Sequence, residues 1–78
     1  SADPFLVTVE PSAADAPIHL NSHQGQEFNY VTSGSLLLTI GKKTLTLNEG
    51  DSIYFDATQP HGMKAIGDKA VQFLAIIF

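Results

Sequence analysis

Three residues with metal-binding or acid–base side chains lie four positions apart in one short segment. His19, His23 and Glu27 occur in the sequence His-Leu-Asn-Ser-His-Gln-Gly-Gln-Glu, and His61 follows far along the chain in Gln-Pro-His-Gly. Two imidazoles and a carboxylate from separate segments form a facial triad, which binds Fe, Mn, Ni, Zn or Cu and leaves positions open for a ligand. The same residue types also form ordinary surface ion pairs and turns. The backbone therefore decides whether these residues meet.

The spacing of the segment sets a geometric condition for such a site. In a straight strand, at roughly 3.3 Å per residue, His23 and Glu27 would stand about 13 Å apart. Gly25 lies midway between them and can adopt the positive φ that turns the chain back. We therefore expect His23 and Glu27 to converge, and His19, at the far end of an extended run, to stay outside. Asn21 shares the strand face of His23, near enough for its side-chain oxygen to reach the same centre.

The hydrophobic pattern of the remaining chain is that of β-strands. Alternating or continuous apolar runs predict strands at residues 5–9, 36–40, 44–47, 53–55 and 71–78. The gaps contain turn residues, and the one helix-friendly stretch is short and lies between two prolines. Short strands with a turn about every ten residues are typical of an all-β sandwich or barrel.

Composition limits the class of partner. The chain has 78 residues, 44% of them hydrophobic, with no cysteine, four Lys or Arg and a net charge of −4. One small domain is expected, with residues 1–4 as an edge or linker of a longer protein and residues 5–78 as the domain. The scarcity of cations excludes direct nucleic-acid binding by this domain, and no apolar run is long enough for a membrane span. The absence of cysteine fits a cytoplasmic location.

The last predicted strand, at residues 71–78, is apolar on both faces. Such a strand is usually covered on both sides, by a second sheet or by a partner chain. A small monomer has little left over to cover it. A homodimer is therefore expected.

Two motifs in the sequence resemble those of the cupin family. The first family motif runs His-x-His, three or four residues, Glu, six residues, Gly, and here residues 21–23 are followed by Glu27 and Gly34. The second runs Gly, five residues, Pro-x-Gly, two residues, His, three residues, Asn. Here Gly50 and His61 keep that spacing, and Asp56, Thr58 and Ala65 replace the Pro, the Gly and the Asn. The resemblance covers nearly the whole chain and implies a double-stranded β-helix, the jelly-roll barrel of cupins.

The resemblance also implies a ligand set. His23, Glu27 and His61 stand at the family's metal-ligand positions, and Asn21 replaces the first His as a fourth ligand or a substrate contact. The implied cofactor is a divalent transition metal (Fe, Mn, Ni, Zn or Cu). The same barrel without a metal would bind a small organic molecule instead.

The detailed sequence most resembles the C-terminal sensor cupins of bacterial helix-turn-helix transcriptional regulators. In that arrangement a separate domain binds DNA, while the cupin dimerises and senses a small-molecule ligand. The ligand pocket would be lined by residues in phase with the motif, namely Asn29, Val31, Phe55 and Met63. A sensor and dimerisation domain without catalytic residues is the first function that the resemblance implies.

Two other functions stay open. The resemblance extends to phosphonate epoxidases, dioxygenases and isomerases, in which a His-Glu-His triad would make the chain a metalloenzyme. Tyr30 and Tyr54 are then the only candidate acids near the motifs. A purely structural β module is the third function, and it would require that the triad be replaceable without effect on any ligand.

Overall fold

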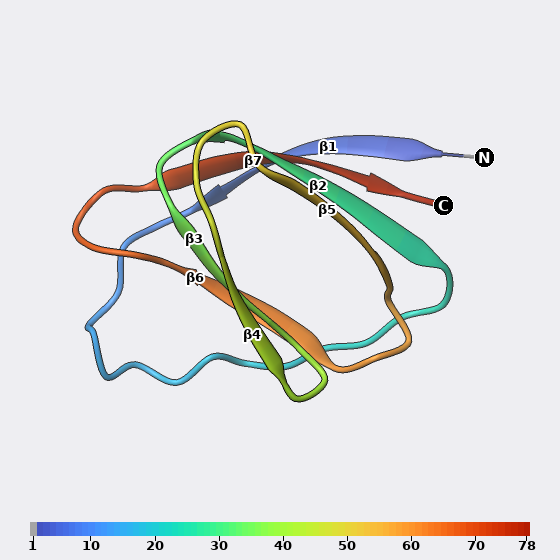
Figure 1. The fold of residues 1–78 in the computed structure, drawn as a ribbon, viewed down its shortest axis with the longest axis horizontal. Coiled ribbons are helices and arrows are strands. Elements are labelled where there is room, and N and C mark those ends of the chain that lie inside the picture. Colours follow the sequence, from blue (N-terminus) through green and yellow to red (C-terminus); the bar gives the residue numbers. More distant parts are fainter. Residues whose placement is uncertain (1) are drawn as a thin grey trace.

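The computed structural model describes residues 2–78, and this part of the chain forms seven β-strands and no helix (Figure 1). The strands are β1 (Asp3–Val9), β2 (Gln26–Ser33), β3 (Leu36–Ile40), β4 (Lys43–Leu47), β5 (Ser52–Asp56), β6 (His61–Ala65) and β7 (Val71–Ile77). The prediction of an all-β fold is confirmed.

The strands form two antiparallel sheets that face each other. One sheet has the order β1-β7-β2-β5 and the other the order β4-β3-β6. Figure 1 shows the second sheet crossing over the first, with the long segment between β1 and β2 running around the outside. This pairing of two antiparallel sheets is consistent with the predicted jelly-roll barrel.

The core lies between the two sheets and is built from the alternate residues that point inward. Val31, Leu36, Leu38 and Val71 are fully buried, and Phe73 is 2% exposed. Burial of each such side chain stabilises the fold by about 1.5–3 kcal/mol relative to leaving it in water. The predicted strands at 5–9, 36–40, 44–47, 53–55 and 71–78 correspond to β1, β3, β4, β5 and β7.

Strand β6 occupies residues that the sequence pattern indicates as a turn. Its sequence, His-Gly-Met-Lys-Ala, lacks the β-branched residues that favour strands. Gly62 explains the composition, because a Cβ there would collide with the carbonyl oxygen of His19 and the side chain of Ile18. The glycine lets the segment before β2 pass directly over β6, and the close approach removes the usual strand signal.

Strand β7 lies in the middle of its sheet, between β1 and β2. Its inward residues Val71, Phe73 and Ala75 are buried, whereas Leu74 and Ile76 on the outward face are half-buried. The homodimer that would cover the outward face stays a prediction. Residues 2–78 contain no helix with the length and apolar character that crossing a bilayer requires.

Candidate metal centre

Glu27 is placed inside the barrel by the alternation of β2. Glu27, Asn29 and Val31 all point inward and are 6%, 0% and 0% exposed. In the sheet, Glu27 lies between Phe55 of β5 and Ile77 of β7. A carboxylate in such a place is costly unless it is paired with a cation or a hydrogen-bond donor.

His61 enters the same space from the opposite sheet. It is the first residue of β6, lies opposite Ile40 of β3 and is 7% exposed. Its backbone exchanges two hydrogen bonds of 2.8 Å with Asn21, which forms an isolated bridge outside the named strands. The segment before β2 therefore fixes the start of β6.

His23 is brought to the site by a tight turn at Gly25. The φ of Gly25 is 95°, as predicted, and a Cβ there would collide with the carbonyl oxygen of Phe78. On either side of the turn, the amide of His23 donates to Ala57 O (2.9 Å) and the amide of Ala57 donates to Gly25 O (3.0 Å). The predicted turn at Gly25 is present, but the predicted strand from His19 to His23 is reduced to an isolated bridge at Asn21, because these bonds tie the chain to residue 57 instead of to a neighbouring strand.

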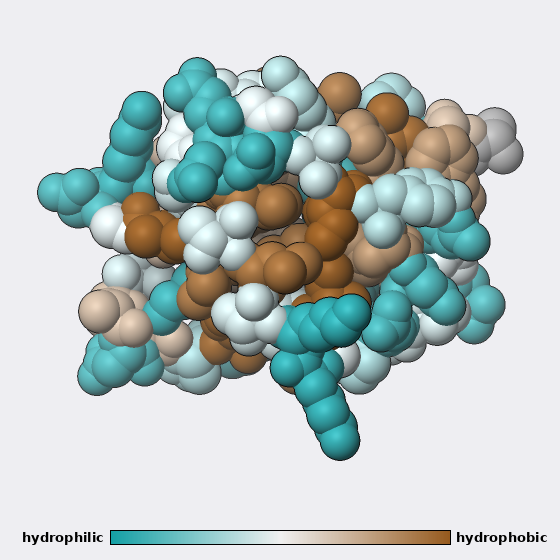
Figure 2. All heavy atoms as spheres, in the orientation of Figure 1, coloured by the Kyte–Doolittle hydropathy of each residue, from teal (hydrophilic) through white to brown (hydrophobic). Residues whose placement is uncertain are grey.

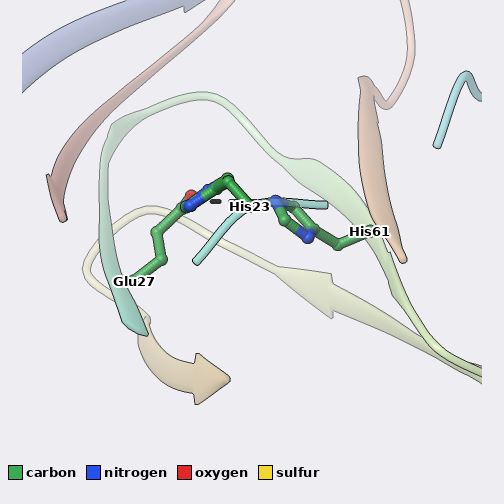
Figure 3. Close-up of side chains that lie close together, drawn as sticks. All are labelled: His23, Glu27 and His61. Atoms are coloured by element: carbon green, nitrogen blue, oxygen red, sulfur yellow. Dashed lines mark hydrogen bonds and ion pairs between the residues drawn. The ribbon is translucent and has the colours of Figure 1, made fainter. Parts of the chain in front are cut away.

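The three side chains converge, as Figure 3 shows. One ligand atom from each of His23, Glu27 and His61 lies within 4.8 Å of the other two. Glu27 Oε1 is 3.1 Å from His23 Nε2 and 3.7 Å from His61 Nε2. The imidazole rings meet edge to face, with centroids 5.3 Å apart and planes at 78°.

The other nitrogen of each ring is held by a backbone carbonyl. His23 Nδ1 lies 3.1 Å from Gln24 O, and His61 Nδ1 lies 2.9 Å from Gln59 O. A carbonyl oxygen only accepts, so each Nδ1 carries a hydrogen and donates it, and each neutral ring presents a lone pair on Nε2. Carbonyls that orient histidine in this way are typical of metal-ligand histidines.

The convergence of acceptors leaves a place for a cation. Two Nε2 lone pairs and a carboxylate oxygen face one another, and none of the three can donate to the others unless a proton is added. The hydrogen bond to Gln24 O, together with the hydrogen bond and charge of Glu27, raises the pKa of His23 above its ordinary 6.5, against the opposing effect of burial. A proton can fill this place, and so can a divalent ion with the nitrogen and oxygen ligands that Fe, Mn, Ni, Zn and Cu accept.

Of the three side chains, that of His23 is the most exposed to solvent. The side chain of His23 is 35% exposed, whereas those of Glu27 and His61 are each 8% exposed. On the inner side, the ring of Phe55 contacts His61 with centroids 5.0 Å apart. An ion held here would be shielded by the barrel and reachable past His23.

Two other residues of the segment before β2, His19 and Asn21, lie outside the cluster. His19 is exposed and outside the cluster, as predicted. Asn21 is exposed and contacts His61 through its backbone. A role of its side chain as a fourth ligand stays a prediction.

The four predicted pocket residues lie in different surroundings. Val31 belongs to the apolar core, and Met63 is half-buried against that core. Asn29 is fully buried, and neither its amide oxygen nor its amide nitrogen has a hydrogen-bond partner within residues 2–78. Phe55 alone lines a surface hollow, between β4 and β5.

Sequence reasoning missed the groups that orient the histidines, because they are backbone atoms. Gln24 O and Gln59 O are present whatever the side chain. The sequence does carry one indication of the Gln59 carbonyl. Pro60 restricts Gln59 to extended conformations, in which the carbonyl points sideways from the chain. The tie between His23 and Ala57 has no comparable signal.

Solved structures with this fold include iron and cobalt proteins. The chain is similar to an iron(II) form of HppE with its substrate, at 30% identity and a TM-score of 0.89, covering 100% of this chain and 46% of that one. It is similar to hydroxypropylphosphonic acid epoxidase from S. wedmorenis with fosfomycin, at 28% identity and a TM-score of 0.83, covering 96% and 42%. A cobalt(II) form of HppE with Tris buffer matches at 27% identity and a TM-score of 0.86, covering 100% and 46%.

The chain thus spans less than half the length of these structures. No protein with a curated description matches it. The model of the cupin domain family matches residues 5–77. With the two-sheet fold and the His-Glu-His cluster, this match shows that the chain belongs to the cupin family.

Proposed function

We propose that this domain binds one divalent transition metal ion through His23, Glu27 and His61 and presents it to a small organic ligand for oxidation. The observation that carries the proposal is the convergence of two Nε2 atoms and a carboxylate oxygen while both Nδ1 atoms are held by carbonyls. The similarity to iron(II) and cobalt(II) forms of HppE supports metal binding by a domain of this fold. Iron(II) is the ion that we favour.

The residues of the chain would divide the work as follows. When bound, the ion would supply Lewis acidity and, as iron(II), reactivity toward dioxygen. Glu27 offsets part of its charge, and the Gln24 and Gln59 carbonyls keep the rings in their binding orientation. Phe55 packs against the ring of His61 on the inner side, and His23 would hold the ion on the side that is more open to solvent.

A sensor function is the second candidate, and one observation favours it. Tyr30 and Tyr54, the only candidate acids from the sequence, are 39% and 60% exposed. Their strand positions put them on the outward face, opposite to the inward residues Glu27, Asn29 and Phe55. Without a protein acid or base beside the triad, the domain would bind a ligand without turning it over, as in the sensor domain of a transcriptional regulator that works as a dimer.

Metal content tests the proposal. Untagged protein, purified without chelator, is compared with His61→Ala and with His19→Ala, which removes an exposed imidazole outside the cluster. We expect close to one ion per chain in the native protein and in His19→Ala, and less than a tenth of that in His61→Ala. Equal metal in the two variants would contradict the proposed site.

Oxygen uptake separates the two candidates. The iron(II)-loaded domain is mixed with a panel of small organic acids and alcohols while dissolved oxygen is recorded. An enzyme consumes oxygen with one of these compounds and loses this uptake in Glu27→Ala. A sensor binds a compound, detected by a shift in melting temperature, with no uptake above that of free iron(II).

A further inference from the structure

A hollow of about 340 Å³ lies beside the metal centre, on the open side of the sandwich between the edge strands β4 and β5. Its walls are largely apolar and its rim carries two lysines and a glutamine; the lining residues are Ile40, Leu45, Ile53, Tyr54, Phe55, Lys42, Lys43 and Gln59. Figure 2 shows hydrophobic surface in the middle of this face, with hydrophilic side chains around it. The volume is at the small end of the range of ligand pockets, so it suits a molecule of one ring.

The two lysines of the rim are free to meet a ligand. Within residues 2–78 neither Lys42 nor Lys43 makes a side-chain hydrogen bond or salt bridge. Lys64, by contrast, donates to Ala14 O and Ala16 O at 2.8 and 3.0 Å. Half of the lysines of a chain with a net charge of −4 therefore gather at one hollow, with their ammonium groups available.

No carboxylate side chain among the described residues lines the hollow. Asp56, the residue after Phe55, uses its Oδ1 to accept hydrogen bonds from Thr58 N (2.9 Å) and Thr58 Oγ1 (2.7 Å). Those bonds hold the carboxylate on its own turn. The charged side chains that line the rim are thus both positive and attract anions.

The hollow and the metal centre share walls. Ile40 of β3 lies opposite Lys43 of β4 on one side and opposite His61 of β6 on the other. Phe55 contacts the His61 ring, and Gln59, which also lines the hollow, accepts the His61 Nδ1 hydrogen bond. The triad itself does not line the hollow, so a molecule there touches the residues that hold His61.

We propose that this hollow binds a small organic anion with an apolar body, the acidic group at Lys42 and Lys43 and the body against Phe55. Two strand spacings, roughly 10 Å, separate the backbone of Lys43 from that of His61. The acidic group is therefore held away from the metal centre, and the body of the molecule lies against Phe55, which contacts the ring of His61. That this anion is the ligand of the metal centre rests on the proposed function, whereas its binding to the hollow does not.

Three probes of similar shape test the binding in metal-free, isotope-labelled protein. Benzoate is the anion, benzamide is its neutral counterpart, and phenylphosphonate carries more negative charge. We expect benzoate to shift the amide signals of Lys42, Lys43 and Gln59 and to bind about five times more tightly than benzamide at low salt, since two exposed charge pairs contribute modestly and are screened. Phenylphosphonate should bind at least as tightly as benzoate.

A single-charge variant with a matched control locates the effect. Lys43→Gln should lower the preference for benzoate over benzamide about threefold. Lys69→Gln removes another exposed lysine, from the loop before β7, and should leave the preference unchanged. Equal affinity for benzoate and benzamide, or equal losses in the two variants, would overturn the proposal.

The outcome is distinguishable from that of the proposed function. A protein that takes up no metal but prefers benzoate through Lys43 would retain the anion site and refute the metal centre. A protein that binds metal but does not distinguish benzoate from benzamide would support the metal centre and refute the anion site. If the anion is the ligand of the metal centre, the metal-loaded protein binds benzoate more tightly than the metal-free protein, by about twofold or more; equal affinities would refute that link.

Discussion

The two ends of strand β2 point into the same interior and differ in what they contribute. Val31 is fully buried among apolar residues and stabilises the fold, whereas Glu27 is nearly as buried but faces two imidazoles. Asn29, between them, is fully buried without a hydrogen-bond partner among the described residues. The apolar end favours folding, and the polar end costs stability unless a cation or ligand meets it. This contrast indicates that the end of the barrel around Glu27 is the functional one.

Truncation at the apolar end has the largest expected effect on stability. Leu38→Ala empties a fully buried position, and we expect it to lower the free energy of unfolding by about 3 kcal/mol. Leu20→Ala, at a side chain that is 52% exposed, should lower it by less than about 1 kcal/mol. Urea denaturation measures both, and equal losses would show that the interior is not packed as described.

The turn at Gly25 directly precedes the polar end of β2, and its substitution should affect both stability and metal binding. Gly25→Ala meets a positive φ and the carbonyl oxygen of Phe78, so we expect a loss of about 2 kcal/mol and weaker metal binding. Gly67→Ala has a φ of +80° with nothing within 4 Å of the new Cβ. This control should lose about 1 kcal/mol and keep its metal affinity. A Gly25→Ala protein with unchanged metal affinity would separate the turn from the site.

Replacing the buried Asn29, whose amide has no hydrogen-bond partner among the described residues, should stabilise the protein, whereas most core mutations destabilise it. We expect Asn29→Leu to raise the free energy of unfolding by about 1 kcal/mol, because it removes two polar atoms that make no protein hydrogen bond. The metal content should not change, since Asn29 is not one of the converging residues. Denaturation and metal analysis of the same preparation check both points. A loss of stability would mean that the amide is satisfied in solution.

Acid should weaken metal binding gradually, through proton competition at His23. Its pKa lies above 6.5, chiefly because Gln24 O accepts a hydrogen bond from the ring, so protons compete at a higher pH than for free imidazole. Between pH 7.5 and pH 6.0 we expect the zinc affinity to fall by about tenfold. The stability of the metal-free protein depends on pH in the opposite direction. The protonated ring of His23 pairs with Glu27 and stabilises the fold, and this stabilisation is lost as the pH rises through the pKa of His23. Titrations at constant ionic strength measure the first effect, and a pH-independent affinity would contradict it.

The sequence predicts the fold well where side chains carry the signal. Alternation at residues 36–40 and 44–47 locates the β3–β4 hairpin, and Gly25 between a histidine and a glutamate predicts their convergence. The sequence pattern does not predict strand β6, because Gly62, which has a low strand propensity, is needed there for a close contact with the segment before β2. His61 enters the site only through the cupin motif, since its own neighbours indicate a turn.

The atoms that orient the two histidines cannot be predicted from residue types. Gln24 and Gln59 contribute carbonyl oxygens, and any residue at these positions has one. Their direction is set by the turn at Gly25 and by the start of β6, which depend on hydrogen bonds between distant segments. The arrangement through which the triad would bind a metal is therefore a property of the fold.

The most direct test of the central claim is the nitrogen NMR spectrum of the three histidines, recorded with and without one equivalent of zinc. Long-range proton–nitrogen correlations assign the state of each ring nitrogen. We expect Nδ1 of His23 and His61 to stay protonated in both states, Nε2 of both to shift on zinc addition, and His19 to remain unchanged. Zinc binding at Nδ1, or a spectrum in which His23 and His61 do not respond, would contradict the account of the site.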